Sequence, residues 1–202
     1  MVPESIIKNR LLRVIGYKQI IAMCLALLGC SFYTGYAVAQ SPSLDDATLK
    51  AVFIERFTRF VDWPEEALSN IPQEKFVLCV FGEDEFLDVA SKVYATQKIL
   101  QHQVIVKTVD LDQVKNCHIL YLPFLSQTKL VEVLSQLNGE PVLTIGDTRG
   151  YAHRGVQINF FYINDQLRFE INEAAMRKAD FQVSYKLLSY AVIVEPFGNE
   201  NF

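Results

Sequence analysis

The sequence predicts an α/β fold: a single domain with a mainly parallel central sheet flanked by helices, and with a C-terminal antiparallel hairpin. Two observations favour this class. Between residues 76 and 145, short runs that are apolar along their whole length alternate with segments of helical periodicity, as in parallel strands covered on both faces. After Gly146, two strand-like runs flank Asn164-Asp165, a two-residue turn of the kind that joins antiparallel strands.

The first expected helix covers residues 43–61, with Ser43 as its N-cap and with Phe57 and Phe60 on its apolar face. It ends at Trp63, because the proline that follows disfavours helical geometry for the residue before it. Trp63 is the only tryptophan in the chain. We expect it to fill the core beneath the sheet, and the alternative is that these three aromatic residues form part of a partner-binding surface.

The remaining elements follow from the same periodicities. Strands are predicted at 76–81, 104–109, 117–122 and 141–145, and helices at 84–94 and 126–137. The hairpin strands are expected at 156–163 and 166–171, followed by a helix from Asn172 to about 179, a helical turn or two at 184–191 and an extended end at 192–194.

The first 39 residues have the pattern of a cleavable signal peptide. A front with four Lys or Arg residues precedes an apolar stretch at about 20–32, and Ala37-Val38-Ala39 fits an A-x-A cleavage site. The apolar stretch is shorter than the roughly 20 residues that a membrane-spanning helix needs, which argues against the alternative of a retained anchor. We therefore expect a signal peptide at 1–39 and a mature domain at 40–202.

Lipidation is a further alternative, because Leu27-Leu28-Gly29-Cys30 is similar to a bacterial lipobox. With the basic residues in front, cleavage, anchoring and lipidation at Cys30 all place the body of the protein outside the cytoplasm. The expected location is the periplasm.

The net charge and the cysteine content bear on the kind of partner and on disulfide formation. The whole chain has a net charge of −4, and its leader holds four basic residues and one acidic residue, so residues 40–202 carry −7. An acidic body argues against a nucleic-acid partner, which would need a basic face. Outside the leader only Cys79 and Cys117 remain. They are natural disulfide partners in an oxidising compartment, or two buried unpaired thiols, and the residues alone leave both options open.

No motif for catalysis, nucleotide binding or metal binding is present. The glycines at 146, 150 and 155 form no G-x-G-x-x-G, and neither a phosphate loop nor a G-x-S-x-G occurs. The three histidines, at 102, 118 and 153, have no metal-ligand spacing. We expect no enzyme activity, no cofactor and no metal.

The candidate binding site is the loop at 147–155, which follows a predicted strand and holds Arg149, Tyr151, His153 and Arg154. Ligands of open α/β sheets bind beyond the carboxyl ends of the strands, so the loop could recognise an anionic or aromatic partner. The alternative is a solvated connection whose glycines serve its turns.

Seven segments in fixed order carry a family resemblance: residues 49–63 with Trp63-Pro64, 76–82, 116–121, 142–147, 155–160, 168–172 and 184–188. In this order and spacing the chain resembles the YfiR family of bacterial periplasmic proteins. The resemblance implies a non-enzymatic, homodimeric regulator. It would repress an inner-membrane diguanylate cyclase by binding the periplasmic sensor region, and so control cyclic diguanylate signalling and biofilm. An OmpA-like outer-membrane lipoprotein could draw it away.

The resemblance also implies a disulfide between Cys79 and Cys117, where the family has a cysteine pair. The chain departs from the family at Arg154-Gly155, where two glycines are common, and lacks a second cysteine pair near 147–158. We expect partner contacts at the aromatic residues 57, 60 and 63 and at the 147–155 loop. The alternative function is a periplasmic module that binds a small aromatic or anionic solute.

Overall fold

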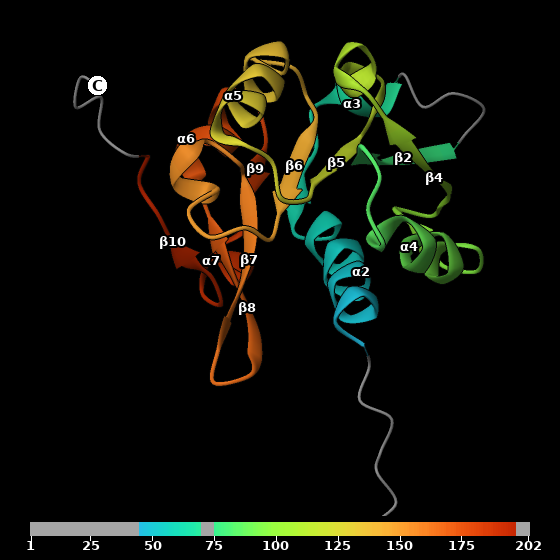
Figure 1. Cartoon of the computed structure of the whole chain (residues 1–202), viewed down its shortest axis with the longest axis horizontal. Coiled ribbons are helices and arrows are strands. Elements are labelled where there is room, and N and C mark those ends of the chain that lie inside the picture. The colour runs from blue at the N-terminus through green and yellow to red at the C-terminus, as the bar shows by residue number, and fades with distance from the viewer. Residues whose placement is uncertain (1–44, 70–74, 197–202) are drawn as a thin grey trace, which may run out of the picture. The chain divides into compact units, whose positions relative to one another are not determined.

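The computed structural model describes residues 45–69 and 75–196, and Figure 1 shows their arrangement. The described residues after Ser43 belong to one compact unit. The predicted signal peptide, Cys30 and the predicted N-cap Ser43 lie outside the described residues.

An eight-stranded sheet in the order β10-β8-β7-β6-β5-β2-β4-β3 forms the centre of the fold. The pairs β4–β2, β2–β5, β5–β6, β6–β7 and β10–β8 are parallel, whereas β7–β8 and β3–β4 are antiparallel. The strands are β2 (Lys75–Phe81), β3 (Lys98–Ile99), β4 (His102–Val109), β5 (Ile119–Leu122), β6 (Leu143–Gly146), β7 (Ile158–Ile163), β8 (Gln166–Ile171) and β10 (Val192–Ile193). The predicted α/β class, the mainly parallel sheet and the hairpin are confirmed.

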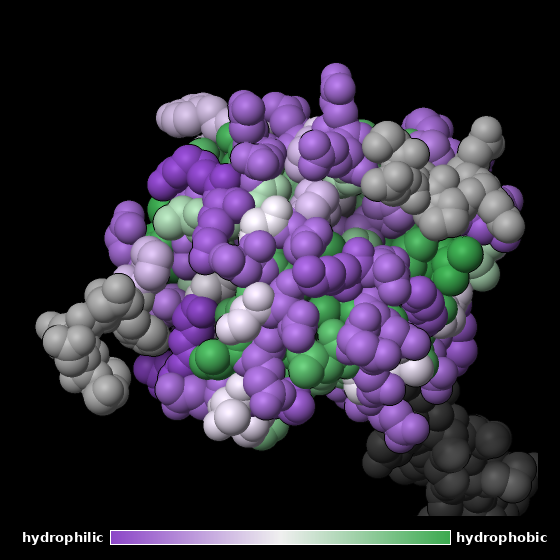
Figure 2. Space-filling model, turned by 90° about the horizontal axis from the view of Figure 1, so that it is seen from above, coloured by the Kyte–Doolittle hydropathy of each residue, from purple (hydrophilic) through white to green (hydrophobic). Residues whose placement is uncertain are grey.

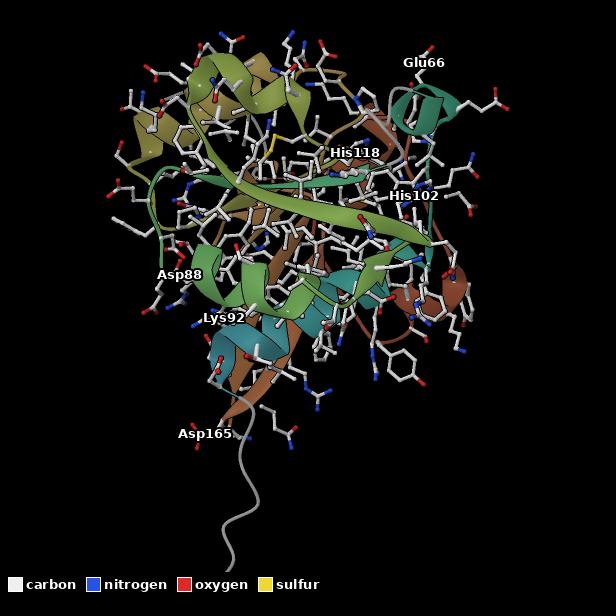
Figure 3. The ribbon with its side chains drawn as sticks, turned by 90° about the vertical axis from the view of Figure 1, so that its right-hand side faces the viewer. Glu66, Asp88, Lys92, His102, His118 and Asp165 are labelled. Carbon is white, nitrogen blue, oxygen red and sulfur yellow. A yellow bond between two sulfur atoms is a disulfide. The ribbon has the colours of Figure 1, made fainter. Side chains whose placement is uncertain are left out.

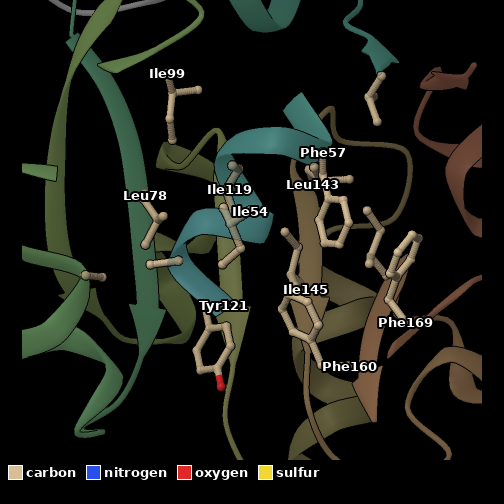
Figure 4. Packing of buried hydrophobic residues seen from close by; sticks show 14 of the residues in the cluster. Ile54, Phe57, Leu78, Ile99, Ile119, Tyr121, Leu143, Ile145, Phe160 and Phe169 are labelled. Carbon is tan, nitrogen blue, oxygen red and sulfur yellow. The ribbon is translucent and has the colours of Figure 1, made fainter. Parts of the chain in front are cut away.

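Helices cover the two faces of this sheet. On one face, α2 (Asp46–Thr58) and α4 (Phe86–Tyr94) pack on residues such as Leu78, as Figure 4 shows for α2. On the other face, α5 (Gln127–Gln136) and the 3₁₀ helix η3 (Leu111–Asn116) pack on residues such as Leu120. Alternate residues of each buried strand point to opposite faces, which is why these strands are apolar along their whole length.

Shorter elements complete the chain. They are α3 (Glu65–Ser69), η4 (Ala152–Arg154), α6 (Glu173–Lys178) and α7 (Tyr185–Leu188), together with a two-stranded antiparallel sheet of β1 (Val61–Asp62) and β9 (Gln182–Val183). No helix in the described part of the chain is long and apolar enough to cross a membrane.

The predicted boundaries of the first helix are wrong at both ends. The helix begins at Asp46, because the Asp45 side chain accepts the backbone N–H of Thr48 at 2.7 Å and caps it. It ends at Thr58, and Val61 pairs with Val183 in the small sheet. This pairing joins residues more than a hundred positions apart, so local periodicity could not show it.

The turn of the β7–β8 hairpin is as predicted. Asn164 and Asp165 have φ values of 49° and 59°, the left-handed geometry that a two-residue hairpin turn requires and that Asn and Asp tolerate. Figure 3 shows Asp165 at the tip of the hairpin.

Two side-chain links join β2 to the start of β5. Cys79 and Cys117 form a disulfide with a Cα–Cα distance of 5.9 Å, which confirms the pairing that the resemblance implied. The backbone N–H of Val77 donates to the ring Nδ1 of His118 at 2.9 Å. The backbone N–H of His118 donates to the Val77 carbonyl at 2.9 Å. The His118 ring also stacks on Phe76. Figure 3 shows the disulfide and His118 in the interior. Cys117 lies just before β5 and does not open it, because it is the C-cap of η3.

His118 is a buried histidine whose neutral form the fold prefers. Burial is the main cause that lowers its pKa below the ordinary value, although backbone hydrogen bonds act in the opposite direction. The unprotonated Nδ1 is needed to accept the Val77 N–H.

Removing the disulfide should lower the free energy of unfolding by about 4 kcal/mol, the chain-entropy value for a loop of this size. Denaturant unfolding of the oxidised protein, the reduced protein and Cys79→Ala/Cys117→Ala measures this loss. The reduced protein and the double variant should lose similar amounts. Equal stability of oxidised and reduced protein would contradict the prediction.

Acid should destabilise the fold partly through His118. The pKa of His118 is lower in the folded state than in the unfolded state. The contribution of neutral His118 to the free energy of unfolding is therefore present above the unfolded pKa of about 6.5 and is lost as the pH falls below it. His118→Asn keeps an acceptor for the Val77 N–H but does not titrate. Between about pH 7.5 and pH 5 this variant should lose less unfolding free energy than wild type. His153→Asn, outside the core, is the control. The prediction is wrong if the unfolding free energy of His118→Asn depends on pH as steeply as that of wild type.

Candidate functional site

The carboxyl edge of the parallel strands holds a cluster of polar side chains. Tyr121 comes from β5, Asp147 directly follows β6, and Lys50 reaches them from α2. Asp147 Oδ2 accepts hydrogen bonds from Lys50 Nζ and from Tyr121 Oη, both at 2.7 Å. Lys50 Nζ also forms an ion pair with Asp46 Oδ2 at 2.6 Å.

The electrostatics of this cluster fix its protons. Burial would lower the pKa of Lys50, but the hydrogen bonds and charges of Asp147 and Asp46 outweigh it and raise the pKa above its ordinary value. Burial and the neighbouring Asp147 carboxylate raise the pKa of the Tyr121 phenol. Both groups therefore stay protonated and act as fixed donors to Asp147. The cluster ties α2 to the sheet, at the edge where many α/β proteins bind a ligand.

The 147–155 loop does not form one continuous binding site. Tyr151 is buried, and its Oη accepts the Leu125 N–H at 2.6 Å and donates to the Pro123 carbonyl at 3.1 Å. It therefore supports the connection between β5 and α5. Gly146 is required beside it, because a Cβ at this position would lie 2.7 Å from Tyr151 Cδ2.

The charged members of the loop lie nearer the surface. Arg149 and Arg154 are exposed, and His153 is half-buried. Arg154 donates to the Gly150 carbonyl at 3.3 Å, and His153 Nδ1 lies 2.8 Å from the Glu195 carbonyl oxygen. These contacts join the loop to itself and to the C-terminal segment.

The three aromatic candidates differ in exposure. Phe57 is only 1% exposed and stacks on Phe160 in the core. Trp63 is half-buried, with edge contacts to Phe76 and Phe181 and with its Nε1 donating to the Thr58 carbonyl at 3.3 Å. Trp63 thus packs against the core without being fully buried in it, whereas Phe57 lies inside it.

Phe60 lies at the edge of that core. It is half-buried, and the Lys186 ammonium lies 5.3 Å from its ring centroid, within cation–π range. The backbone N–H of Ser184 donates to the Phe60 carbonyl at 2.9 Å. Phe60 therefore borders α7, whereas Phe57 is inaccessible to a partner in this conformation.

An exposed apolar surface at the C-terminal end was missed by sequence reasoning. Of the ten large apolar residues that are exposed in the described part of the chain, six belong to the C-terminal elements: Tyr162 and Ile163 of β7, Tyr185 of α7, Tyr190 just after it, and Val192 and Ile193 of β10. We call them the C-terminal apolar surface. Tyr185 and Tyr190 are the most exposed of the six, at 85% and 69%. Figure 1 shows the β7–β8 hairpin projecting from the body, with α7 and β10 beside it.

The same region contains an open sheet edge. β10 pairs with β8 on one side only, so its other side offers backbone groups to a further strand. Apolar side chains beside an open edge are typical of protein-binding surfaces. Among the described residues, no group of three or more His, Cys, Asp or Glu is placed to hold a metal ion.

Two sequence signals could have led to these features. Lys50 is a charged residue within the apolar segment 49–54, and a lysine there must find a buried partner or reach solvent. The run at 190–194, with Tyr190 followed by four apolar residues, is longer than β10 needs. The first signal does not identify Asp147 as the partner of Lys50, and the second does not show that the apolar side chains are exposed.

Replacing Lys50 with Met should destabilise the protein, because Asp147 would lose its counter-charge in a part-buried position. We expect the free energy of unfolding to fall by roughly 2–3 kcal/mol. This loss is smaller than the ~3–5 kcal/mol for breaking a fully buried ion pair, because the Asp147 side chain is partly exposed. Denaturant unfolding measures it. Lys115→Met, which breaks the exposed pair with Glu140, is the control and should cost less than about 1 kcal/mol. Equal losses would contradict a structural role for Lys50.

A comparison with protein-family models identifies the family of the chain. The model of the YfiR/HmsC-like family matches residues 47–192, which include most of α2 and every strand of the described residues except the last residue of β10. No curated protein matches the chain significantly. The family match covers most of the chain and agrees with the resemblance that the seven segments carry. The chain belongs to the YfiR/HmsC-like family.

Proposed function

We propose that this protein is a periplasmic regulator without enzymatic activity, which represses an inner-membrane diguanylate cyclase by binding its periplasmic sensor region. Membership of the YfiR/HmsC-like family supports the regulatory class. The C-terminal apolar surface is the observation that carries the proposal, because it offers contact area and a strand edge to a protein partner.

The carboxyl edge of the sheet supports the same conclusion. Lys50, Tyr121 and Asp147 bind one another there. Lys50 and Tyr121 keep their protons, because hydrogen bonds and charges of Asp147 and Asp46 hold the proton on Lys50, and burial and the Asp147 carboxylate hold the proton on Tyr121, so neither of these two groups is poised as a general base or nucleophile.

The mechanism would be thermodynamic linkage. Binding to the cyclase only in its inactive state stabilises that state by the difference in affinity, and a competing partner removes the stabilisation. An OmpA-like outer-membrane lipoprotein is the competitor that we propose. Cleavage at residue 39 would leave a soluble regulator that can reach both membranes, whereas lipidation at Cys30 would tether it to one.

We also propose that the protein forms a homodimer. The contact between the two copies would lie at the C-terminal apolar surface, whose exposed side chains it would cover. A second copy and the cyclase would then compete for the same surface. Phe60 borders this surface, and Arg149 lies on the other candidate surface, the 147–155 loop.

A cellular test separates this surface from a general need for apolar residues. In a strain that lacks the gene and carries the cyclase, the wild-type full chain should lower cyclic diguanylate severalfold. Tyr185→Asp/Tyr190→Asp should fail to do so, because buried acidic groups at the interface would be unpaired. Cyclic diguanylate is measured by mass spectrometry, and periplasmic protein levels by immunoblot.

Phe124→Asp is the matched control. Phe124 is 80% exposed, lies between β5 and α5, and is not one of the six residues of the C-terminal apolar surface. It should repress like wild type. Normal repression by the double Tyr variant, or loss of repression in Phe124→Asp at normal protein level, would count against the proposed surface. No change in cyclic diguanylate on deletion would overturn the proposed function.

A further inference from the structure

A wide groove lies between α5 and α6, on a part of the molecule that the proposed partner contact does not use. Its cavity volume is about 1310 Å³. We call it the α5–α6 groove and define it by Val131 and Leu134 of α5, Thr144 and Gln157 of the floor, and Arg154 and Lys178 at the rim. Figure 2 looks onto the side of the molecule where α5 lies and shows apolar side chains exposed among hydrophilic ones.

The wall from α5 is apolar. Val131 and Leu134 line the groove together with Leu137 and Val142. Val131 is 55% exposed, so its side chain is accessible to a molecule that enters the groove. The opposite wall comes from Ala174 and Ala175 of α6, whose small side chains leave the space open.

The floor is polar and buried. Gln157 Oε1 accepts from the backbone N–H and the Oγ1 of Thr144, so its orientation is fixed. Gln157 Nε2 makes only a long contact of 3.5 Å to the Ala175 carbonyl, and an amide nitrogen has two N–H donors. The floor therefore offers a fixed donor to a ligand that enters between the walls.

The charge of the groove is opposite to that of the protein. Among the described residues that line it, Arg154 and Lys178 are cationic and none is acidic, although the chain has a net charge of −4. The acidic residues of the two helices do not line the groove: Glu132 of α5 lines the adjoining hollow beside Leu111, which shares Val131 with the groove, and Glu173 of α6 lines one beside Phe181.

An apolar wall, a fixed donor and a positive rim match one class of ligand. We propose that the α5–α6 groove binds a small organic anion with an apolar body, such as an aryl-alkyl carboxylate. The apolar body would lie against Val131 and Leu134, and the carboxylate would lie toward Lys178 and Arg154. This site goes beyond the proposed function, because it involves neither the cyclase nor the C-terminal apolar surface.

Of the loop residues proposed from the sequence, only some belong to this groove. His153, Arg154 and Gly155 line it, whereas Arg149 and Tyr151 do not. The expected preference for an anionic solute thus rests on the end of the loop together with α6.

The test uses the purified protein with 4-phenylbutyrate and its neutral analogue 4-phenylbutyramide. Amide shifts in ¹H–¹⁵N spectra should saturate with the acid at a Kd of about 1 mM or below, and should concentrate at Gly155, Gln157, Ala174 and Ala175. The amide should bind roughly tenfold more weakly, since it lacks the charge. Equal binding of acid and amide, shifts elsewhere, or no saturation up to about tenfold higher concentration would overturn the proposal.

Variants on one helix give the matched comparison. Lys178→Gln should weaken binding of the acid about two- to fivefold and leave the amide unaffected. Arg177→Gln, its neighbour on the surface that faces Phe181, should leave both unchanged. Val131→Glu, at an exposed position, should weaken the acid more than the amide. An equal loss in Lys178→Gln and Arg177→Gln would contradict the proposed position of the carboxylate.

Discussion

The ion pair between Lys50 and Asp147 is the constraint on which the rest of the structure depends. An ammonium group can lie at the junction of α2 and the sheet only if a carboxylate meets it, and Asp147 does so at 2.7 Å while Tyr121 donates to the same oxygen. This contact fixes α2 against the carboxyl edge of β5 and β6. The aromatic packing of Phe57 and the position of Trp63 follow from the place of that helix.

The same interaction has a consequence for function. Parallel sheets commonly bind ligands beyond the carboxyl ends of their strands, and here that position is taken by the protein's own Lys50 and Tyr121. Recognition is therefore left to outer surfaces. The C-terminal apolar surface suits a protein partner, and the cationic α5–α6 groove suits a small anion. Because the two surfaces are made by different elements, the two proposals together describe a regulator that receives a small anion at one surface and a protein partner at the other.

The sequence contained enough information for the sheet but less for the site. Whole-length apolar runs such as 76–81 identify buried parallel strands, and Asn164-Asp165 identifies the hairpin turn, because both signals are local. The β1–β9 pair escaped prediction, since two-residue strands gain their stability only from distant partners. Phe57 shows why the site was harder to predict. Its spacing along the helix does not tell whether the side chain is buried in the core or available to a partner. Only its packing against Phe160, which comes from a distant strand, shows that it is buried.

The claim that partner contact occurs at the C-terminal apolar surface is tested most directly by hydrogen–deuterium exchange of the full chain, with and without the periplasmic region of the cyclase. Amides that bond within the sheet already exchange slowly, so the informative sites are the outer edge of β10 and the hairpin. We predict slower exchange over residues 158–171 and 185–194 in the complex. Protection confined to α4 and β4, or to the segment around Asp147, would contradict it.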